Sequence, residues 1–259
     1  MMAAGVDVGA ESVKLVMLKD EEILFLKAVT TEEEGEIASR CLLDEGLKKT
    51  GLTRNAFSCI VSTGTGRATV SFADQHRSQQ LCHARGTHWR IPSVRTVLDI
   101  GAEGSRAMRV NEKGKVTDFA VNSKCASGTG VFLKSMTKIV DLPLEEMGQM
   151  AAAANTAVKI SSFCAVFAES EVISRIHTGS SKESIVAGIH ESVVSRLMEV
   201  LNRVKIEKDL AVTGGVAKNI GIIGRLEART NLKIRIPEEP QATGALGAAL
   251  IARDIGGKQ

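Results

Sequence analysis

Two cysteines of this chain each stand directly before a segment whose pattern predicts a helix. Cys125 lies in the segment Lys124–Gly130, ahead of a periodic apolar run, and Cys164 lies ahead of the segment Ala165–Glu171. A thiolate at such a point faces unpaired backbone N–H groups and the positive end of the helix dipole, which favour the negative charge of a metal-bound sulfur. An iron-sulfur cluster normally takes four thiolates, so the missing pair would have to come from a second subunit.

Glycine-rich turns supply a second kind of chemistry. Two apolar strands are predicted to end in Asp-x-Gly, one at Asp7–Gly9 and one at Asp99–Gly101. A tight turn of this kind brings backbone N–H groups against phosphate oxygens, and its carboxylate can hold Mg²⁺ or a water molecule. Two such turns that face each other would clamp a nucleotide. The residues predicted to act there are Asp7 and Asp99 as catalytic carboxylates, and Gly9, Ala10, Ser12, Lys14, Gly101 and Ala102 as nucleotide-binding residues.

A third glycine turn fits the nucleoside. The segment Val212–Asn219 reads as a strand, a Gly-Gly pair and a helix start, so the missing side chains admit a flat ring while the helix N-terminus favours anions. Its predicted binding residues are Gly214, Gly215 and Lys218. No G-x-x-x-x-G-K-[ST] sequence occurs, which excludes a P-loop. A single glycine turn between a strand and a helix usually has only a structural role. Three such turns in the order phosphate, phosphate, nucleoside make a nucleotide site and a purely structural role about equally well supported.

Short β-branched runs alternate with longer helical patterns, which is typical of an α/β fold. Each Asp-x-Gly strand is followed by an antiparallel neighbour, so the chain resembles two copies of one motif. We expect strands at 5–19, 22–30, 57–62, 96–101, 105–110, 115–121, 209–213 and 232–236, and helices at 32–46, 130–140, 144–153, 165–178, 182–204, 217–229 and 242–252. We expect a first subdomain over 1–92 that also takes the C-terminal helix 242–259, and a second over 93–241 that carries both cysteines.

The amino-acid composition limits the kinds of partner that this protein is expected to bind. The 259 residues carry a formal net charge of +3 from 33 basic and 30 acidic side chains, without a basic block, and the aromatic residues are seven Phe, one Trp and no Tyr. A nucleic-acid surface is therefore not expected. The sequence has no run of about 18 apolar residues and no secretory leader pattern, so we expect a cytoplasmic protein without membrane contact.

The other cysteines are predicted to be structural. Five cysteines at irregular spacing fit reduced thiols or metal ligation better than a disulfide framework. Cys41, Cys59 and Cys82 are interpreted as small apolar side chains. Cys82 stands beside His83, but neighbouring helix residues point about 100° apart and no third ligand is evident, so the pair is not a predicted metal site. His190, on a predicted helix, is also expected to be structural.

The order and wording of the glycine turns resemble the actin, sugar-kinase and heat-shock-chaperone ATPase superfamily. The segments Lys124–Gly130, Cys164–Glu171 and Gly188–His190 narrow the resemblance to the activators of 2-hydroxyacyl-CoA dehydratases and the ATP-binding subunits of benzoyl-CoA reductase. The resemblance covers nearly the whole chain, from Gly5 to Ala249. It implies an actin-like (ribonuclease H-like) ATPase fold, with two duplicated subdomains of mixed sheets flanked by helices.

The resemblance also implies a function. Cys125 and Cys164 would ligate half of one 4Fe-4S cluster shared between two subunits. ATP, bound with Mg²⁺, would be hydrolysed to drive one low-potential electron into a CoA-thioester reductase of the benzoyl-CoA reductase type or into a 2-hydroxyacyl-CoA dehydratase. A donor such as ferredoxin or flavodoxin would supply the electron.

One turn departs from the family pattern. Activators usually carry Asp-Ile-Gly-Gly-Gln-Asp at the second phosphate turn, whereas this chain has DIGAEG over Asp99–Gly104. Glu103 takes the position of the glutamine and is a predicted catalytic residue that orders water, while Gly104 replaces the second acidic residue. A heterodimer with a homologous ATP-binding subunit therefore competes with a homodimer, and hydrolysis by this chain alone is open. The alternatives are a small-metabolite kinase of the same fold and a non-redox, nucleotide-sensing regulatory subunit.

Overall fold

The computed structural model describes residues 1–30, 34–122, 128–161 and 164–257, so Cys125 lies outside the described residues. The strands are β1 (Met2–Val8), β2 (Ser12–Lys19), β3 (Glu22–Thr30), β4 (Cys59–Gly64), β5 (Gln75–His76), β6 (Thr96–Ile100), β7 (Ser105–Val110), β8 (Val116–Asn122) and β9 (Leu210–Thr213). The α-helices are α1 (Gly35–Thr50), α2 (Gln79–Arg90), α3 (Gly130–Val140), α4 (Leu144–Ala153), α5 (Ala165–His177), α6 (Lys182–Val204), α7 (Ile220–Thr230) and α8 (Thr243–Gly256). Short 3-10 helices are η1 (Arg54–Ala56), η2 (Arg67–Thr69), η4 (Gly215–Lys218) and η5 (Pro240–Ala242).

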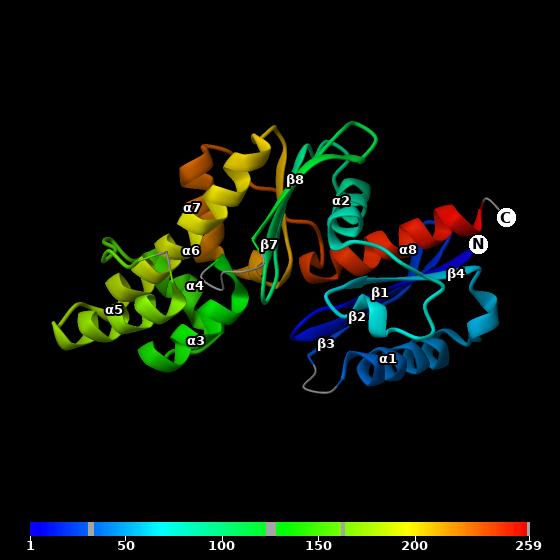
Figure 1. The fold of residues 1–259 in the computed structure, drawn as a ribbon, viewed down its shortest axis with the longest axis horizontal. Helices are drawn as coiled ribbons and strands as arrows, with labels where there is room; N and C mark the ends of the chain where they lie inside the picture. Colours follow the sequence, from blue (N-terminus) through cyan, green and yellow to red (C-terminus); the bar gives the residue numbers. More distant parts are fainter. Residues whose placement is uncertain (31–33, 123–127, 162–163, 258–259) are drawn as a thin grey trace.

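The strands form two mixed sheets that share one internal plan (Figure 1). The first sheet has the order β3-β2-β1-β4-β5, and the second has the order β8-β7-β6-β9. β1 pairs antiparallel with β2 and parallel with β4, and β6 pairs in the same two ways with β7 and β9. The duplication that the two Asp-x-Gly strands predict is confirmed, and it extends to β4 and β9.

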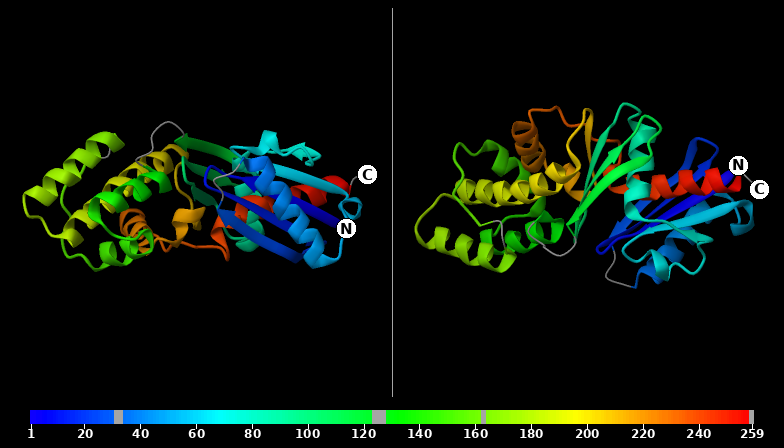
Figure 2. Two further views of the ribbon diagram at one scale, coloured as in Figure 1. Left: turned by 90° about the horizontal axis from the view of Figure 1, so that it is seen from below. Right: turned by 45° about the horizontal axis from the view of Figure 1, so that its top comes forward.

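Helices cover both sheets. α1 lies on one face of the first sheet and α8 on the opposite face (Figures 1 and 2), while α3 to α7 gather around the second sheet. The second sheet and its helices share one large apolar cluster, in which Leu98 and Ile100 of β6 pack with Phe132 of α3 and Ile189 of α6. Burial of this apolar area is the main force that holds the helices to the sheet.

Helix α2 packs between the two sheets. Cys82 belongs to an apolar cluster with Ala3 of the first sheet, whereas Ala84 belongs to another with Val97 and Met108 of the second sheet. Neighbouring side chains of this helix thus face different sheets. The sequence predicts no element over 79–90, because the polar residues of this stretch hide its apolar period.

Several predicted elements differ from the observed ones. The predicted helices at 130–140, 144–153 and 182–204 have the bounds of α3, α4 and α6, which confirms them. The run predicted over 5–19 divides into β1 and β2 at the turn predicted for Asp7–Gly9, where the Gly9 N–H donates to the Ser12 carbonyl at 3.0 Å and β2 begins. α1 continues past its predicted end to Thr50, where Gly51 at φ 68° forms a left-handed C-cap.

Two elements predicted near the C-terminal end are less regular in the structure than predicted. The helix expected over 217–229 is divided into η4 and α7 by Asn219, whose Oδ1 accepts the Ile222 N–H at 3.1 Å and caps α7. The strand expected over 232–236 is reduced to one isolated bridge between Ala211 and Arg235. In both places a local capping or pairing contact replaces a longer regular element.

Helix α8 returns the chain to the first sheet, so both termini lie at the same end of the molecule (Figure 2). Its small residues allow very close packing: a Cβ on Gly247 would lie 1.7 Å from the Cys82 carbonyl oxygen, and a Cβ on Gly5 would lie 2.1 Å from the Ala245 carbonyl oxygen. Because backbone atoms occupy these spaces, α2, α8 and β1 form one tightly packed unit. The division into subdomains near residue 92 stays a prediction.

We predict that Gly247→Ala lowers the free energy of unfolding by about 1–3 kcal/mol, because the added methyl group forces α8 away from the α2 backbone. The matched control is Gly224→Ala in α7, where a Cβ would meet no atom within 4 Å. That control should raise the free energy of unfolding by up to about 1 kcal/mol, since alanine favours a helix. Urea unfolding of the three proteins measures both effects, and equal midpoints for the two variants would contradict the packing argument.

Candidate functional site

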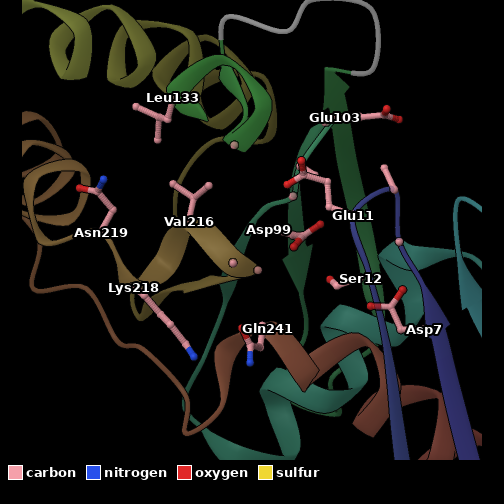
Figure 3. Close-up of a pocket in the computed structure, with 18 of the residues that line it drawn as sticks. Asp7, Glu11, Ser12, Asp99, Glu103, Leu133, Val216, Lys218, Asn219 and Gln241 are labelled. Carbon is pink, nitrogen blue, oxygen red and sulfur yellow. The ribbon is translucent and has the colours of Figure 1, made fainter. Parts of the chain in front are cut away.

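A cavity of about 530 Å³ lies between the two sheets. All residues that the sequence predicts for the nucleotide line it, namely Asp7, Gly9, Ala10, Ser12, Lys14, Asp99, Gly101, Ala102, Glu103, Gly214, Gly215 and Lys218. Figure 3 shows Asp7, Ser12 and Asp99 toward one side of this cavity, with Leu133, Val216 and Asn219 toward the other. The three glycine turns, far apart in the sequence, thus meet at one place.

The two Asp-x-Gly turns have the same local geometry. The Gly9 N–H donates to the Ser12 carbonyl at 3.0 Å, and the Gly101 N–H donates to the Gly104 carbonyl at 2.9 Å. Each glycine therefore closes its own turn. The N–H groups available to a phosphate belong to the residues that follow, such as Ala10 and Ala102.

A Thr-Gly pair stands beside each of these turns. Asp7 lies opposite Thr63 of β4, and Asp99 lies opposite Thr213 of β9. The next residues, Gly64 at φ 96° and Gly214 at φ 86°, adopt the left-handed region that favours glycine. A Cβ on Gly64 would lie 2.6 Å from Asp7 Oδ1, and a Cβ on Gly214 would lie 2.7 Å from Asp99 Oδ1. The sequence reasoning missed Gly64, although the repeated Thr-Gly at a strand end could have revealed it.

Each aspartate also has a cation opposite it on the neighbouring antiparallel strand. Lys14 pairs in register with Asp7, and Arg106 pairs in register with Asp99. Lys14 Nζ lies 3.9 Å from Asp7 Oδ2, whereas Arg106 Nη1 lies closer, 3.1 Å from Asp99 Oδ2. Arg106 also lines the cavity, and the sequence reasoning missed it. A Cβ on Gly104 would lie 3.3 Å from Arg106 Nη2, so this glycine leaves room for the guanidinium group.

Glu103 lies at the rim of the cavity and is exposed. Its side chain points away from Asp99 (Figure 3). Glu11 also lies at the rim, and its Oε1 forms an ion pair with Lys134 Nζ of α3 at 2.6 Å. This ion pair joins the first turn to the helices of the second sheet. Both partners of this pair are substantially exposed, so it contributes about 1 kcal/mol or less.

The opposite side of the cavity is more apolar. Its lining includes Leu133, Leu144, Val216 and Ile220, with the polar Gln149 beside them. A Cβ on Gly215 would meet no atom within 4 Å, so open space lies above this glycine. The apolar lining and the open space suit a flat aromatic ring.

The second turn is bonded directly to helix α3. The Gly130 N–H donates to the Gly101 carbonyl at 3.0 Å, and the Val131 N–H donates to the Ala102 carbonyl at 2.9 Å. These are the first two residues of α3, whose N-cap Thr129 makes no side-chain capping bond. The turn predicted to hold phosphate therefore satisfies N–H groups at a helix start that would otherwise be unpaired.

Comparison with known proteins identifies the family. The sequence pattern of the BadF/BadG/BcrA/BcrD ATPase family matches residues 4–252. The chain belongs to this ATPase family.

Its relatives cover nearly its whole length. The chain is 39% identical to the "Activator of lactoyl-CoA dehydratase" of Anaerotignum propionicum, with 100% of both chains covered. It is 34% identical to one of the benzoyl-CoA reductase subunits of Thauera aromatica, with 96% of this chain and 92% of that protein covered. The solved activator of the 2-hydroxyisocaproyl-CoA dehydratase from Clostridium difficile with bound ADPNP has a TM-score of 0.92 and 39% identity, with 100% of this chain and 96% of that chain covered. The family and the actin-like ATPase fold inferred from the sequence are confirmed.

In the structure, Cys164 is the N-cap residue of α5 and makes no side-chain capping bond. α5 packs against α3, the helix that begins shortly after the Cys125 segment. Cys125 itself lies outside the described residues. Among the described residues, no group of three or more His, Cys, Asp and Glu side chains could hold a metal ion.

In the same part of the chain, no helix is long and apolar enough to cross a membrane.

The three cysteines predicted to be structural differ in their exposure to solvent. Cys41 is exposed, whereas Cys59 and Cys82 are buried. Burial raises the pKa of the Cys82 thiol to about 12 and, together with the nearby Asp74 carboxylate, raises the pKa of Cys59. Both buried thiols stay protonated at neutral pH, which agrees with their predicted structural role.

His190 lies behind the apolar side of the cavity, next to the Asn219 cap. Its Nδ1 is 2.8 Å from the Val186 carbonyl oxygen, while its Nε2 has no hydrogen bond of ordinary geometry among the described residues. Burial lowers the pKa of His190 to about 4, and the Arg225 charge contributes to this lowering. The folded protein therefore holds this imidazole neutral.

The low pKa of His190 predicts acid sensitivity. Between about pH 6.5 and pH 4 the unfolded chain gains a proton at this position while the folded chain does not, so stability is full above pH 6.5 and falls as the pH decreases. The fall approaches about 1.4 kcal/mol per pH unit inside this window. Replacing His190 by Gln should remove this part of the pH dependence, as measured by urea unfolding at pH 7, 6 and 5. The exposed His177→Gln is the control, and an unchanged slope in His190→Gln would contradict the assignment.

Proposed function

We propose that this protein couples ATP hydrolysis to the transfer of one low-potential electron into an enzyme that acts on a CoA thioester. The enzyme would be a 2-hydroxyacyl-CoA dehydratase or a reductase of the benzoyl-CoA reductase type. The proposal draws on the family, on relatives named as dehydratase activators or as part of a benzoyl-CoA reductase, and on one contact of this chain. We place this activity in the cytoplasm, with ferredoxin or flavodoxin as the electron donor.

The contact that carries the proposal is the bonding of the second turn to α3. Gly101 and Ala102, which would meet the phosphates, accept the N–H groups of Gly130 and Val131. α3 directly follows the segment that contains Cys125. A change in the phosphates would thus act on the turn, and the turn would move the start of the helix nearest this cysteine.

The nucleotide would lie across the cavity. The base would lie between the apolar side chains near Gly215, and the phosphates would face the amides after Gly9 and Gly101, with Lys14 beside them. Asp7 and Asp99 fit Mg²⁺ that arrives with the nucleotide, because this ion usually takes one or two carboxylates and completes its shell with phosphate oxygens and water. Glu103 would act only from the rim, where it could order water.

Cys125 and Cys164 would supply two of the four thiolates of a 4Fe-4S cluster, and a second subunit would supply the others. The free N-cap side chain of Cys164 fits this role, since no capping bond occupies it. Such a cluster, when bound, stores and releases the single electron. Val166 and Phe167, which follow Cys164, are 66% and 67% exposed, and apolar side chains so far exposed favour a subunit contact here. The second subunit would be a copy of this chain or a homologous ATP-binding subunit.

Iron content tests the redox part of the proposal. Anaerobically purified protein should hold about two irons per chain, which is half of a four-iron cluster. Cys164→Ala and Cys125→Ala should each lose this iron, whereas Cys41→Ala, at an exposed cysteine on α1, should keep it. Iron and acid-labile sulfide analysis measures the result. A colourless, iron-free protein after cluster reconstitution with a homologous partner subunit would favour the kinase or the regulatory alternative.

Gly130→Pro tests the coupling between nucleotide and helix. The first helical position tolerates proline, but proline removes the N–H that Gly101 accepts and places its Cδ where that hydrogen lay, which separates the turn from the helix start. Gly130→Ala is the matched control, because it keeps the N–H and its Cβ would meet neighbours at 3.4 Å or more.

Both variants should keep their iron and bind ADPNP within about tenfold of the unchanged protein, since one hydrogen bond contributes modestly. The spin-resonance spectrum of the reduced protein should differ between Mg-ADP and Mg-ADPNP in Gly130→Ala but not in Gly130→Pro. If the proline variant kept the nucleotide-dependent difference, the α3 bond would not be the route of coupling.

A further inference from the structure

His83 is a buried residue of α2 that lines the cavity and that the proposed chemistry does not yet use. Only 4% of its surface is exposed. Its Nδ1 lies 3.0 Å from Thr213 Oγ1 and 3.5 Å from Asp99 Oδ1. Its Nε2 lies on the side of the first turn: a Cβ on Gly244 would be 2.8 Å from both His83 Nε2 and Asp7 Oδ2. One imidazole ring therefore stands between the two aspartate turns.

We propose that His83 is the positioning residue that holds the two aspartate turns at the spacing required for Mg²⁺ and the phosphates. This inference rests on the proposed ATPase function and assigns a role to a residue that contacts Asp99, one of the two predicted carboxylate ligands. The imidazole fixes Asp99 and Thr213 through Nδ1, and it presents Nε2 toward Asp7. Nδ1 therefore contacts oxygen atoms of the second sheet, while Nε2 lies on the side of Asp7 in the first sheet.

The surroundings of α2 explain why this residue can act on both sheets. Thr63 and Thr213 occupy equivalent places, opposite Asp7 and Asp99. The Thr63 hydroxyl lies near the Cys82 thiol, where it opposes the effect of burial on the pKa of that thiol, and Thr213 contacts the next residue, His83. Adjacent residues of one helix thus contact the equivalent strand ends of both sheets.

Close packing keeps the ring in place. A Cβ on Gly86 would lie 2.2 Å from the Thr243 carbonyl oxygen, and Gly247 is closer still to the Cys82 carbonyl. The α2 and α8 backbones are therefore in direct contact, and α2 cannot move closer to α8. A side chain of different shape at position 83 changes the relation of the two turns and leaves the frame around them intact.

The test compares three replacements of His83 with a histidine on the same helix. Asn places its amide nitrogen near the position of Nδ1, Gln places it near the position of Nε2, and Ala removes both. His88→Gln is the control, because His88 contacts the Glu112 carbonyl oxygen at 3.0 Å and does not line the cavity. Calorimetry gives the affinity for ADPNP with Mg²⁺ and without it, and thermal unfolding verifies the fold of each variant.

The expected result is a loss of the Mg²⁺ effect alone. His83→Ala and His83→Gln should bind ADPNP without Mg²⁺ as the unchanged protein does, while the increase in affinity that Mg²⁺ produces should fall by about 10- to 100-fold, as for other residues that orient metal ligands. His83→Asn should recover most of this increase, because it keeps the contact with Thr213 and Asp99. ATP hydrolysis should fall in the same order, with little change in KM.

Other results would overturn the inference. An undiminished Mg²⁺ effect in folded His83→Gln, an equal loss in His88→Gln, or equal losses with and without Mg²⁺ would each assign His83 a purely structural role. If Mg²⁺ did not strengthen ADPNP binding in the unchanged protein, the aspartates would not hold the metal and His83 could not position them. If the unchanged protein bound no nucleotide at all, the proposed function would fail, and this inference would fail with it.

Discussion

The contact between a Thr-Gly strand end and the neighbouring Asp-x-Gly turn is the constraint on which the site depends. In both sheets a glycine with positive φ lies so close to the aspartate that any Cβ would reach the carboxylate oxygen, at 2.6 Å for Gly64 and 2.7 Å for Gly214. The parallel pairing of β1 with β4 and of β6 with β9 fixes this contact. Because both sheets use the same pairing, both present a carboxylate to one shared cavity.

The sequence predicts those parts of the site that local chemistry determines. Asp7–Gly9, Asp99–Gly101 and Gly214-Gly215 are short signals, and all of the residues predicted from them line the cavity. Arg106 could have been inferred as well, because it follows Asp99 by the same seven residues that separate Lys14 from Asp7. His83 and Gln149 could not be inferred, since only the packing of distant helices brings them to the cavity. The ligand roles of Cys125 and Cys164 stay predictions.

The secondary structure shows the same contrast between features that local sequence determines and features that depend on tertiary contacts. Helices such as α6 carry a long apolar period, which the sequence displays directly. The break at Asn219 depends on a capping hydrogen bond to the Ile222 N–H, which leaves little trace in the periodicity. α2 was missed because its two faces pack against different sheets, so no single apolar stripe exists.

The bond between the second turn and α3 is made by main-chain atoms on both sides, Gly101 and Ala102 accepting and Gly130 and Val131 donating. Substitution of the side chains in this turn therefore leaves the mechanical connection in place. The side chains at positions 102–104 can therefore change without loss of the two bonds that join the turn to the start of α3. Under the proposed function, a subunit that hydrolyses ATP weakly would still transmit nucleotide occupancy to α3 through these main-chain bonds.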